Sequence, residues 1–224
     1  MNEELRQHYD RADTAADMQA AVDAGEVAWH PARPVWLLDV DGVINAISKN
    51  PDRAIWPKGR WRHLTARCSD IDWPILVATP VVEFIAATHE SGRAEVRWHT
   101  TWQHEANALG ELLGLPEFAV QDCPEFYPER QLAGGAVPVG VRNTWWKLPA
   151  AERVVGEEGR PLIWTDDDID REIGWLGRDR NLRALGRVLT ISPRQHIGLT
   201  PKHLRSIDEF TDAVASAGDK GTSA

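Results

Sequence analysis

Short apolar runs alternate with amphipathic segments along most of the chain, and this alternation predicts the order of its secondary-structure elements. Residues 35–40 (VWLLDV) form the first nearly continuous apolar run, which is typical of a strand buried on both faces of a parallel sheet. Similar runs predict further strands at 94–101, 118–123, 161–168 and 187–192. Helices are predicted between and after them, at 80–92, 102–114, 142–157 and 199–217. This alternation predicts an α/β fold, a Rossmann-like three-layer sandwich around a central, mainly parallel sheet.

Two regions outside this alternation define the expected organisation of the chain. Residues 62–68 and 73–79 are separated by SDID and predict a hairpin, so region 46–79 is expected to form a flap or minimal cap. Residues 1–33 are expected to be a helical extension that the prolines at 31 and 34 end, because proline cannot continue a helix. The main domain is then expected to cover 34–217, followed by a disordered tail at 218–224.

Polar side chains gather at the ends of three predicted strands, at residues 39–41, 100–101 and 166–168. In parallel α/β sheets, ligands bind beyond the carboxyl ends of the strands. Because the three predicted strands belong to one such sheet, their terminal side chains are expected to meet at one site.

The first of these groups is Asp39-Val40-Asp41-Gly42. Two carboxylates spaced i, i+2 at a strand end can reach the same small volume, where one attacks a substrate while the other carries protons. Gly42 permits the tight turn that this requires. The alternative is an ordinary Asp-Gly turn with solvated carboxylates, but its position after a buried strand favours a catalytic role.

The second acidic group, WTDDDID at 164–170, places three carboxylates side by side after an apolar run. These carboxylates repel one another, so a compensating cation is expected. Mg²⁺ is the natural candidate, because it prefers oxygen ligands and binds through few carboxylates. The alternative is the acidic N-terminus of a helix, where the helix dipole favours aspartate.

Taken together, these motifs resemble those of the haloacid dehalogenase (HAD) superfamily. VWLLDVDG (35–42) is similar to its first motif, hhhhDxDG, and VRWHT (96–100) to its second, with Thr101 as the alternative to Thr100. Lys147 fits the third motif and LIWTDD (162–167) the fourth. The phrases LLDVDGVIN, EVRWHTTWQHEAN and IWTDDDID more particularly resemble the HAD domain of "Swiss Army Knife" RNA-repair proteins.

The resemblance implies a magnesium-dependent phosphatase that works through an aspartyl-phosphate. Asp39 would be the nucleophile and Asp41 the general acid and base, while Thr100 and Lys147 would hold the phosphoryl oxygens. The metal ligands would be the Asp39 carboxylate, the backbone carbonyl of Asp41 and the Asp167 carboxylate. Asp166 would be a second-shell or alternative ligand. The dehalogenase branch lacks the acid at the position of Asp41, so phosphoryl chemistry is favoured over carbon–halogen cleavage.

Lys147 is the only lysine between the second and fourth motifs. An ammonium there could neutralise the nucleophile and a bound phosphate. The alternatives are a surface lysine beside two tryptophans, or one of the arginines in the same interval. Those arginines are Arg130, Arg142, Arg153 and Arg160.

The resemblance implies a phosphorylated small molecule or a nucleic-acid end as the partner. The net charge of -9 argues against binding along a long nucleic acid. A local basic loop with tryptophans could still track phosphates and stack bases, or be an ordinary solvated loop. The residues of this basic loop are Lys49, Arg53, Trp56, Lys58, Arg60, Trp61, Arg62 and Arg67. With Gly42 and Thr101, Arg60 completes the predicted substrate-binding set.

The remaining sequence features indicate a cytoplasmic protein. Cys68 and Cys123 are too few for a disulfide framework and are expected to be reduced thiols. No run reaches the about 20 apolar residues of a membrane span, and the polar start of the chain predicts no secretory signal. His99 and His104 flank the second motif but are expected to be core or surface residues.

Other functions share parts of this residue pattern. A signalling receiver domain uses similar residues, but its acidic pair comes first and its lysine last, unlike the order here. A mutase would pass the phosphoryl group to a hydroxyl instead of water. A catalytically silent HAD-fold module would bind a partner without turnover, although every catalytic residue type is present. A phosphatase of small-molecule metabolites is the remaining alternative.

Overall fold

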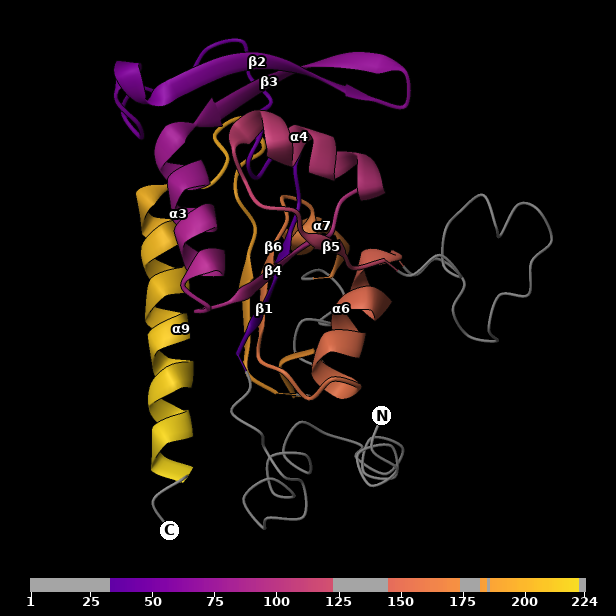
Figure 1. The fold of residues 1–224 in the computed structure, drawn as a ribbon, viewed down its shortest axis with the longest axis vertical. Coiled ribbons are helices and arrows are strands. Elements are labelled where there is room, and N and C mark those ends of the chain that lie inside the picture. The colour runs from indigo at the N-terminus through magenta and orange to yellow at the C-terminus, as the bar shows by residue number, and fades with distance from the viewer. Residues whose placement is uncertain (1–32, 123–144, 174–181, 185, 222–224) are drawn as a thin grey trace, which may run out of the picture.

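The computed structural model describes residues 33–122, 145–173, 182–184 and 186–221. Their centre is a five-stranded sheet with the strand order β5-β4-β1-β6-β7 (Figure 1). All of its neighbouring strands run parallel, which confirms the predicted α/β fold with a mainly parallel sheet. The strands are β1 (Val35–Leu38), β4 (Glu95–Trp98), β5 (Ala119–Val120), β6 (Leu162–Thr165) and β7 (Val188–Ile191).

Helices cover both faces of this sheet. Alternate residues of a strand point to opposite faces, and Trp36 and Leu38 of β1 lie in the core on the side of α3 (Thr79–Glu90) and α9 (Pro201–Gly221). Val35 and Leu37 lie in a second core against α6 (Lys147–Gly156). Figure 1 shows α3 and α9 on one side of the sheet and α6 on the other. Burial of β1 on both faces explains why its sequence is apolar at every position.

The predicted hairpin is present and lies above one end of the sheet, next to α4 (Ala106–Leu113) (Figure 1). It consists of β2 (Trp61–Cys68) and β3 (Ile71–Ala78), which pair antiparallel so that the two ends of the turn, Cys68 and Ile71, face each other. The two residues between them have positive φ angles of 50° and 63°, as in the type I′ turn that suits a twisted hairpin. Two single-turn 3₁₀ helices complete this region, η1 (Lys58–Arg60) and η2 (Gln103–Glu105).

Several boundaries differ from those predicted. The C-terminal helix α9 continues to Gly221, beyond the predicted end at 217. The helix predicted at 142–157 is described as α6, and Pro149 lies in its first turn, where its missing N–H has no helical partner to lose. A short helix, α7 (Ile169–Glu172), follows β6, where an acidic helix N-terminus was the alternative interpretation of residues 164–170. The predicted N-terminal helix, Cys123, Arg130 and Arg142 lie outside the described residues.

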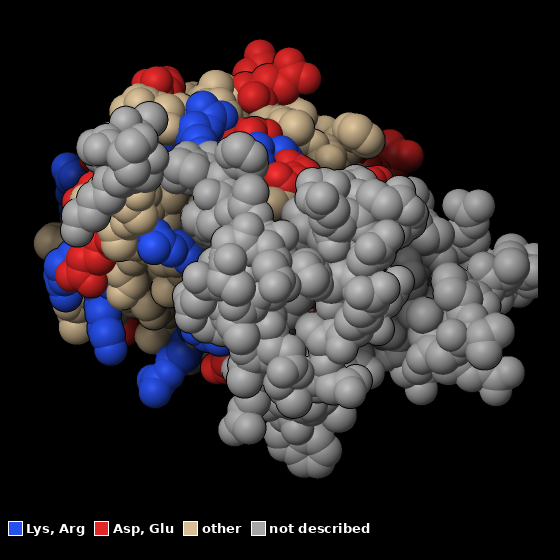
Figure 2. Space-filling view, turned by 90° about the horizontal axis from the view of Figure 1, so that it is seen from below, with Lys and Arg blue, Asp and Glu red and all other residues tan. Residues whose placement is uncertain are grey.

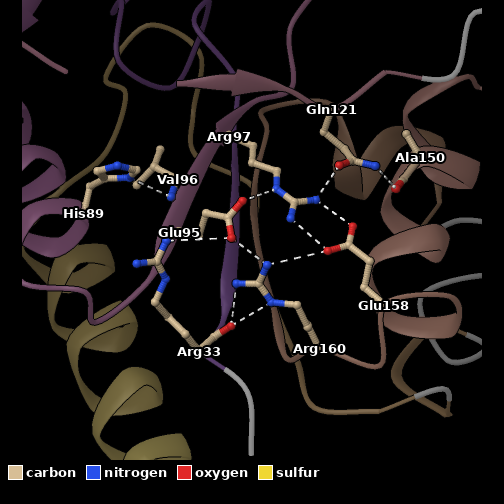
Figure 3. A network of polar contacts seen from close by, with 9 residues as sticks. All are labelled: Arg33, His89, Glu95, Val96, Arg97, Gln121, Ala150, Glu158 and Arg160. Carbon is tan, nitrogen blue, oxygen red and sulfur yellow. Dashed lines mark hydrogen bonds and ion pairs between the residues drawn. The ribbon is translucent and has the colours of Figure 1, made fainter. Parts of the chain in front are cut away.

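A network of ion pairs joins the starts of the strands, at the end of the sheet opposite Asp39 (Figure 3). Arg97 donates to Glu95 and to Glu158 (2.7 and 2.6 Å), and Arg160 donates to Glu95 (2.6 Å) and to the backbone carbonyl of Arg33. Burial raises the pKa of Glu95, but the hydrogen bonds and charges of the two arginines outweigh this effect and lower the pKa to about 2. The network therefore ties β4 to the segments that lead into β1 and β6.

The surface shows mixed charge on the face that Figure 2 presents. On the described part of that face, acidic and basic side chains lie next to one another, without separation into a region of one sign (Figure 2). On this end of the molecule, the described residues therefore form no track of one charge sign for a long polyanion. Among the helices that the structure describes, none combines the length and apolar character needed to cross a membrane.

Candidate functional site

Asp39 lies directly beyond β1, in the middle of the sheet. Its backbone N–H donates to the carbonyl of Thr165 (3.1 Å), so the chain is still paired with β6 where the carboxylate emerges. The Val40 N–H donates to Asp39 Oδ1 (2.8 Å), which fixes one oxygen and leaves Oδ2 to face the site. Asp39 is only 6% exposed, so this carboxylate needs partners inside the protein.

Lys147 supplies the positive partner. Its buried ammonium donates to Asp39 Oδ2 (2.8 Å) and to Asp166 Oδ2 (2.5 Å). Burial by itself lowers the pKa of Lys147, but the charges of Asp39 and Asp166 reverse this effect and raise the pKa above its ordinary value. The ammonium also lies 5.5 Å from the ring centre of Trp145, within cation–π range. Arg160, one of the alternatives to Lys147, belongs to the distant ion network instead.

Asp166 and Asp167 follow β6, the neighbour of β1. Asp166 is fully buried, and its second oxygen accepts the Asp168 N–H (2.9 Å). Burial and the charge of Asp39 raise the pKa of Asp166 well above its usual range, against the opposing effect of Lys147. Burial, Asp168 and Asp39 together raise the pKa of Asp167 to about 6. The positive charge of Lys147 therefore does not fully compensate the negative charges around Asp166 and Asp167.

Asp39, Asp166 and Asp167 could together hold a metal ion. Each offers one oxygen, and these oxygens all lie within 4.8 Å of one another. Three carboxylates and one ammonium leave a net charge of -2 when all are ionised, which one divalent cation would balance. A donor set made only of oxygen suits a hard cation such as Mg²⁺. The chemistry of these residues therefore fits the metal that the sequence predicts.

Gly42 makes room for this cluster. It has a φ of +73°, and a Cβ built on it would lie 2.4 Å from Cγ of Asp167. That distance is far shorter than a van der Waals contact, so any larger residue would displace the Asp167 carboxylate. Gly42 is thus required both for its backbone conformation and for the space that Asp167 fills.

The Asp41 carboxylate has partners of its own. Oδ1 accepts from the side-chain amide of Asn45 and Oδ2 from the indole N–H of Trp102, each at 2.8 Å. The Leu76 N–H donates to Asn45 Oδ1 (2.9 Å), so the amide can only present its NH₂ group to Asp41. Asn45 and Trp102 therefore fix the orientation of Asp41. Trp102 lies 61 residues from Asp41 in the chain, so its role depends on segments that meet only in the folded protein, whereas Asn45 lies four residues after Asp41.

The two threonines of the second motif have different environments. The N–H of His99 donates to the carbonyl of the last residue of β1 (2.9 Å), which keeps this segment beside Asp39. Thr100 is then buried, and its hydroxyl oxygen accepts the Trp102 N–H (3.3 Å), whereas the side chain of Thr101 is exposed. Of the two threonines, Thr100 is therefore the buried one, next to the strand that carries Asp39.

His99 is buried, as expected, but it also supports the site. Its ring nitrogens lie 2.7 Å from the carbonyl oxygen of Gln121 and 3.0 Å from that of Lys147. Burial and the charge of Lys147 lower the pKa of His99 to about 3, so the ring is neutral. A neutral imidazole has one N–H and donates to only one of these oxygens. His99 packs against the backbone from which the Lys147 ammonium extends.

Of the two interpretations of the basic loop, the contacts of its tryptophans do not favour a base-stacking surface. Trp56 is buried and donates to the carbonyl of Leu199, and Trp61 donates to the carbonyl of Trp56. Arg60, predicted to bind substrate, pairs with Glu83 of α3 (3.2 Å). These contacts correct the idea that Trp56 and Trp61 are available to bases, because both indoles serve the interior.

Searches with protein-family models, among curated proteins and among solved structures found no match to this chain. The fold and the site together define an α/β protein with a buried cluster of carboxylates and one ammonium at the carboxyl ends of its central strands.

Proposed function

We propose that this protein is a metal-dependent phosphomonoesterase of the HAD kind, with Asp39 as the residue that takes up the phosphoryl group. The observation that carries the proposal is the buried Lys147 ammonium shared by Asp39 and Asp166, with Asp167 in reach of both carboxylates. Burying several charges in one place costs free energy, so such a cluster is poorly explained by stability alone. Perturbed carboxylates grouped in this way are typical of functional sites.

The reaction would proceed in two displacements. Asp39 attacks phosphorus, and an oxygen–phosphorus bond forms as the bond to the leaving oxygen breaks. Asp41 gives its proton to that oxygen, which leaves as an alcohol. Asp41 then takes a proton from water as the water attacks the aspartyl-phosphate, which releases inorganic phosphate and restores both carboxyl groups.

The other residues of the site position charge. Lys147 holds Asp39 in place and offers positive charge to the transferred group, while the Thr100 hydroxyl can donate to a phosphoryl oxygen. Asp39, Asp166 and Asp167 would hold Mg²⁺, which when bound neutralises negative charge on the phosphoryl group. Asn45 and Trp102 keep Asp41 oriented for proton transfer.

A phosphate-release assay tests this function. The substrates would be p-nitrophenyl phosphate, mononucleotides, oligonucleotides with 5′- or 3′-phosphates, and small sugar phosphates, each with Mg²⁺ and with EDTA. We expect turnover that needs the metal and that Asp39→Asn lowers on the order of 10³-fold or more, as loss of a nucleophile does.

Asp212→Asn is the matched control, because it makes the same chemical change at an exposed carboxylate of α9 that pairs with Arg93, away from the site. Turnover that survives Asp39→Asn would remove the nucleophile assignment. No turnover on any substrate would favour a catalytically silent binding module instead.

A further inference from the structure

A groove leaves the candidate site at Asp41. It runs between residues 45–49 and the β2–β3 hairpin, and its volume is about 920 Å³. This volume lies in the range of pockets that hold small organic ligands. Asp41 belongs both to the groove and to the catalytic cluster, so a molecule in the groove would lie next to the proposed proton donor.

The walls of the groove are mostly apolar. Leu64, Trp73 and Ile75 come from the hairpin, and Ile47 comes from the loop that follows Asn45. Leu64 and Ile75 are opposite each other in the two strands, and Trp73 is two residues from Ile75, so the three share one face of the hairpin. An aromatic and aliphatic strip thus leads away from Asp41.

Two of these side chains are exposed although they are large and apolar. Trp73 is 46% and Ile47 49% exposed, and the described residues include only two other exposed large apolar side chains, Ile71 and Leu112. Exposed apolar side chains that gather at one groove, instead of lying scattered, mark a binding surface. Trp73 is therefore a large aromatic side chain that is partly accessible where it lines the groove.

The groove is built from fixed parts. The Ala46 N–H donates to the carbonyl of Leu76 (2.8 Å), and the Leu76 N–H donates to Asn45 (2.9 Å). The loop and β3 are thereby joined along the floor of the groove, and the same Asn45 holds Asp41. The groove is preformed, and its position relative to Asp41 is set by these hydrogen bonds.

We propose that this groove holds the leaving group of the substrate, and that this group carries a flat aromatic ring that stacks on Trp73. The inference rests on the proposed function, because Asp41 gives its proton to the leaving oxygen and the leaving group must lie on that side. Stacking on an indole favours planar rings over sugars and polyols. Ser48 and Lys49 also line the groove and can hydrogen-bond to polar atoms at the edge of such a ring. The ring can belong to a nucleobase or to an aryl alcohol.

Matched substrates with and without an aromatic ring test this inference. Adenosine 5′-monophosphate would be compared with ribose 5-phosphate, and benzyl phosphate with glycerol phosphate, by kcat/KM, because the two leaving alcohols of each pair have similar acidity. We expect the aromatic member of at least one pair to have the higher kcat/KM. The pair that shows this difference identifies the source of the aromatic ring. In Trp73→Ala, kcat/KM for the preferred ringed substrate should fall roughly 5- to 150-fold, the range seen when a base-stacking aromatic is removed. The kcat/KM for its partner without an aromatic ring should be unchanged.

Leu112→Ala is the control, because Leu112 is equally exposed (53%) but does not line the groove. It should leave the preference for the ring unchanged. Equal kcat/KM for ringed and ringless substrates, or an equal loss on both in Trp73→Ala, would overturn the inference while leaving the phosphatase intact.

Binding without catalysis separates the two proposals. Calorimetric titration with adenosine and with benzyl alcohol needs no phosphoryl transfer. Binding that Trp73→Ala abolishes and Leu112→Ala retains would support the groove even if no phosphate were released. Absence of both turnover and binding would overturn the groove together with the proposed function.

Discussion

Two side chains, those of Asn45 and Trp102, set the orientation of Asp41, the candidate general acid and base. Both of its oxygens accept a hydrogen bond, one from Asn45 and one from Trp102, so its orientation does not depend on bound substrate. A proton donor acts only when it lies within hydrogen-bond reach of the leaving oxygen, and a small misplacement is costly. Trp102 combines this role with burial in the core, where it is only 4% exposed.

Replacing Trp102 with phenylalanine keeps an aromatic ring at this position but removes the indole N–H together with part of the ring. A hydrogen bond to a charged group contributes about 1.5–3 kcal/mol, so we expect kcat to fall roughly 10- to 100-fold with a smaller change in KM. Steady-state kinetics and the pH profile of kcat would measure this effect. Trp61→Phe, which also removes a donated indole N–H but outside the site, should leave kcat unchanged. Equal losses in both variants would mean that the effect is only structural.

Gly42 permits a second test at this scale. In Gly42→Ala the new Cβ would collide with Asp167, at 2.4 Å from its Cγ, so we expect the affinity for Mg²⁺ or Mn²⁺ to fall sharply in calorimetric titration. Gly114→Ala is the matched control, because Gly114 has a similar φ of +81° with nothing within 4 Å of a new Cβ. Both variants should lose about 1 kcal/mol of stability from backbone strain. Unchanged metal affinity in Gly42→Ala would argue against Asp167 as a ligand.

Among the elements, α6 is the one that completes the site. It brings Lys147, its first residue, against carboxylates that follow β1 and β6, while His99 beyond β4 packs on the carbonyl of the same lysine. The rings of His99 and Trp146 also meet, at 5.2 Å between centroids. The start of α6 is thus joined to the ends of β1 and β6 through the buried ammonium of Lys147, and to the end of β4 through the backbone carbonyl of the same lysine.

Removing this ammonium should therefore weaken the attachment of α6 to the sheet and lower the free energy of unfolding. Lys147→Met leaves Asp39 and Asp166 buried without a counter-charge, and breaking a buried pair in this way costs about 3–5 kcal/mol. Urea denaturation should show this loss, and Mg²⁺ should restore more stability to the variant than to the unmodified protein. Lys202→Met, at an exposed position of α9, should change stability by less than about 0.5 kcal/mol. Identical denaturation curves for both variants would contradict a central role for Lys147.

Over the whole molecule, the sequence could predict what depends on local pattern and could not predict what depends on strand order. The apolar runs located β1 and β6, and the hairpin and the aspartates followed from their neighbours in the chain. Trp56 and Trp73 show the limit, because only the folded chain makes one buried and the other exposed. Pairing of Arg97 with Glu158, 61 residues apart, likewise depends on the placement of β4 beside β1. The roles of residues that meet only in the folded chain therefore could not be predicted from local sequence patterns.

The ion network and the candidate site occupy opposite ends of the same sheet, so stability and activity should respond separately to substitution. In the folded protein the pKa of Glu95 is about 2, below the ordinary value of 4.5, so its ionised form is stabilised by folding. This contribution is fully present above about pH 4.5 and is lost as the pH falls towards 2. Glu95→Gln should therefore lower the free energy of unfolding at pH 7 by about 1.5–3 kcal/mol, and the difference from the unmodified protein should shrink as the pH falls below 4.5.

Thermal unfolding between pH 7 and pH 3, with phosphatase activity measured at pH 7, would test this prediction. Glu83→Gln is the control, because Glu83 forms an exposed ion pair with Arg60 and such pairs contribute at most about 1 kcal/mol. A Glu95→Gln difference that persists unchanged at pH 3 would show that packing, and not the carboxylate charge, makes the contribution. Loss of turnover at pH 7 in a folded Glu95→Gln protein would instead show that the two ends of the sheet are coupled.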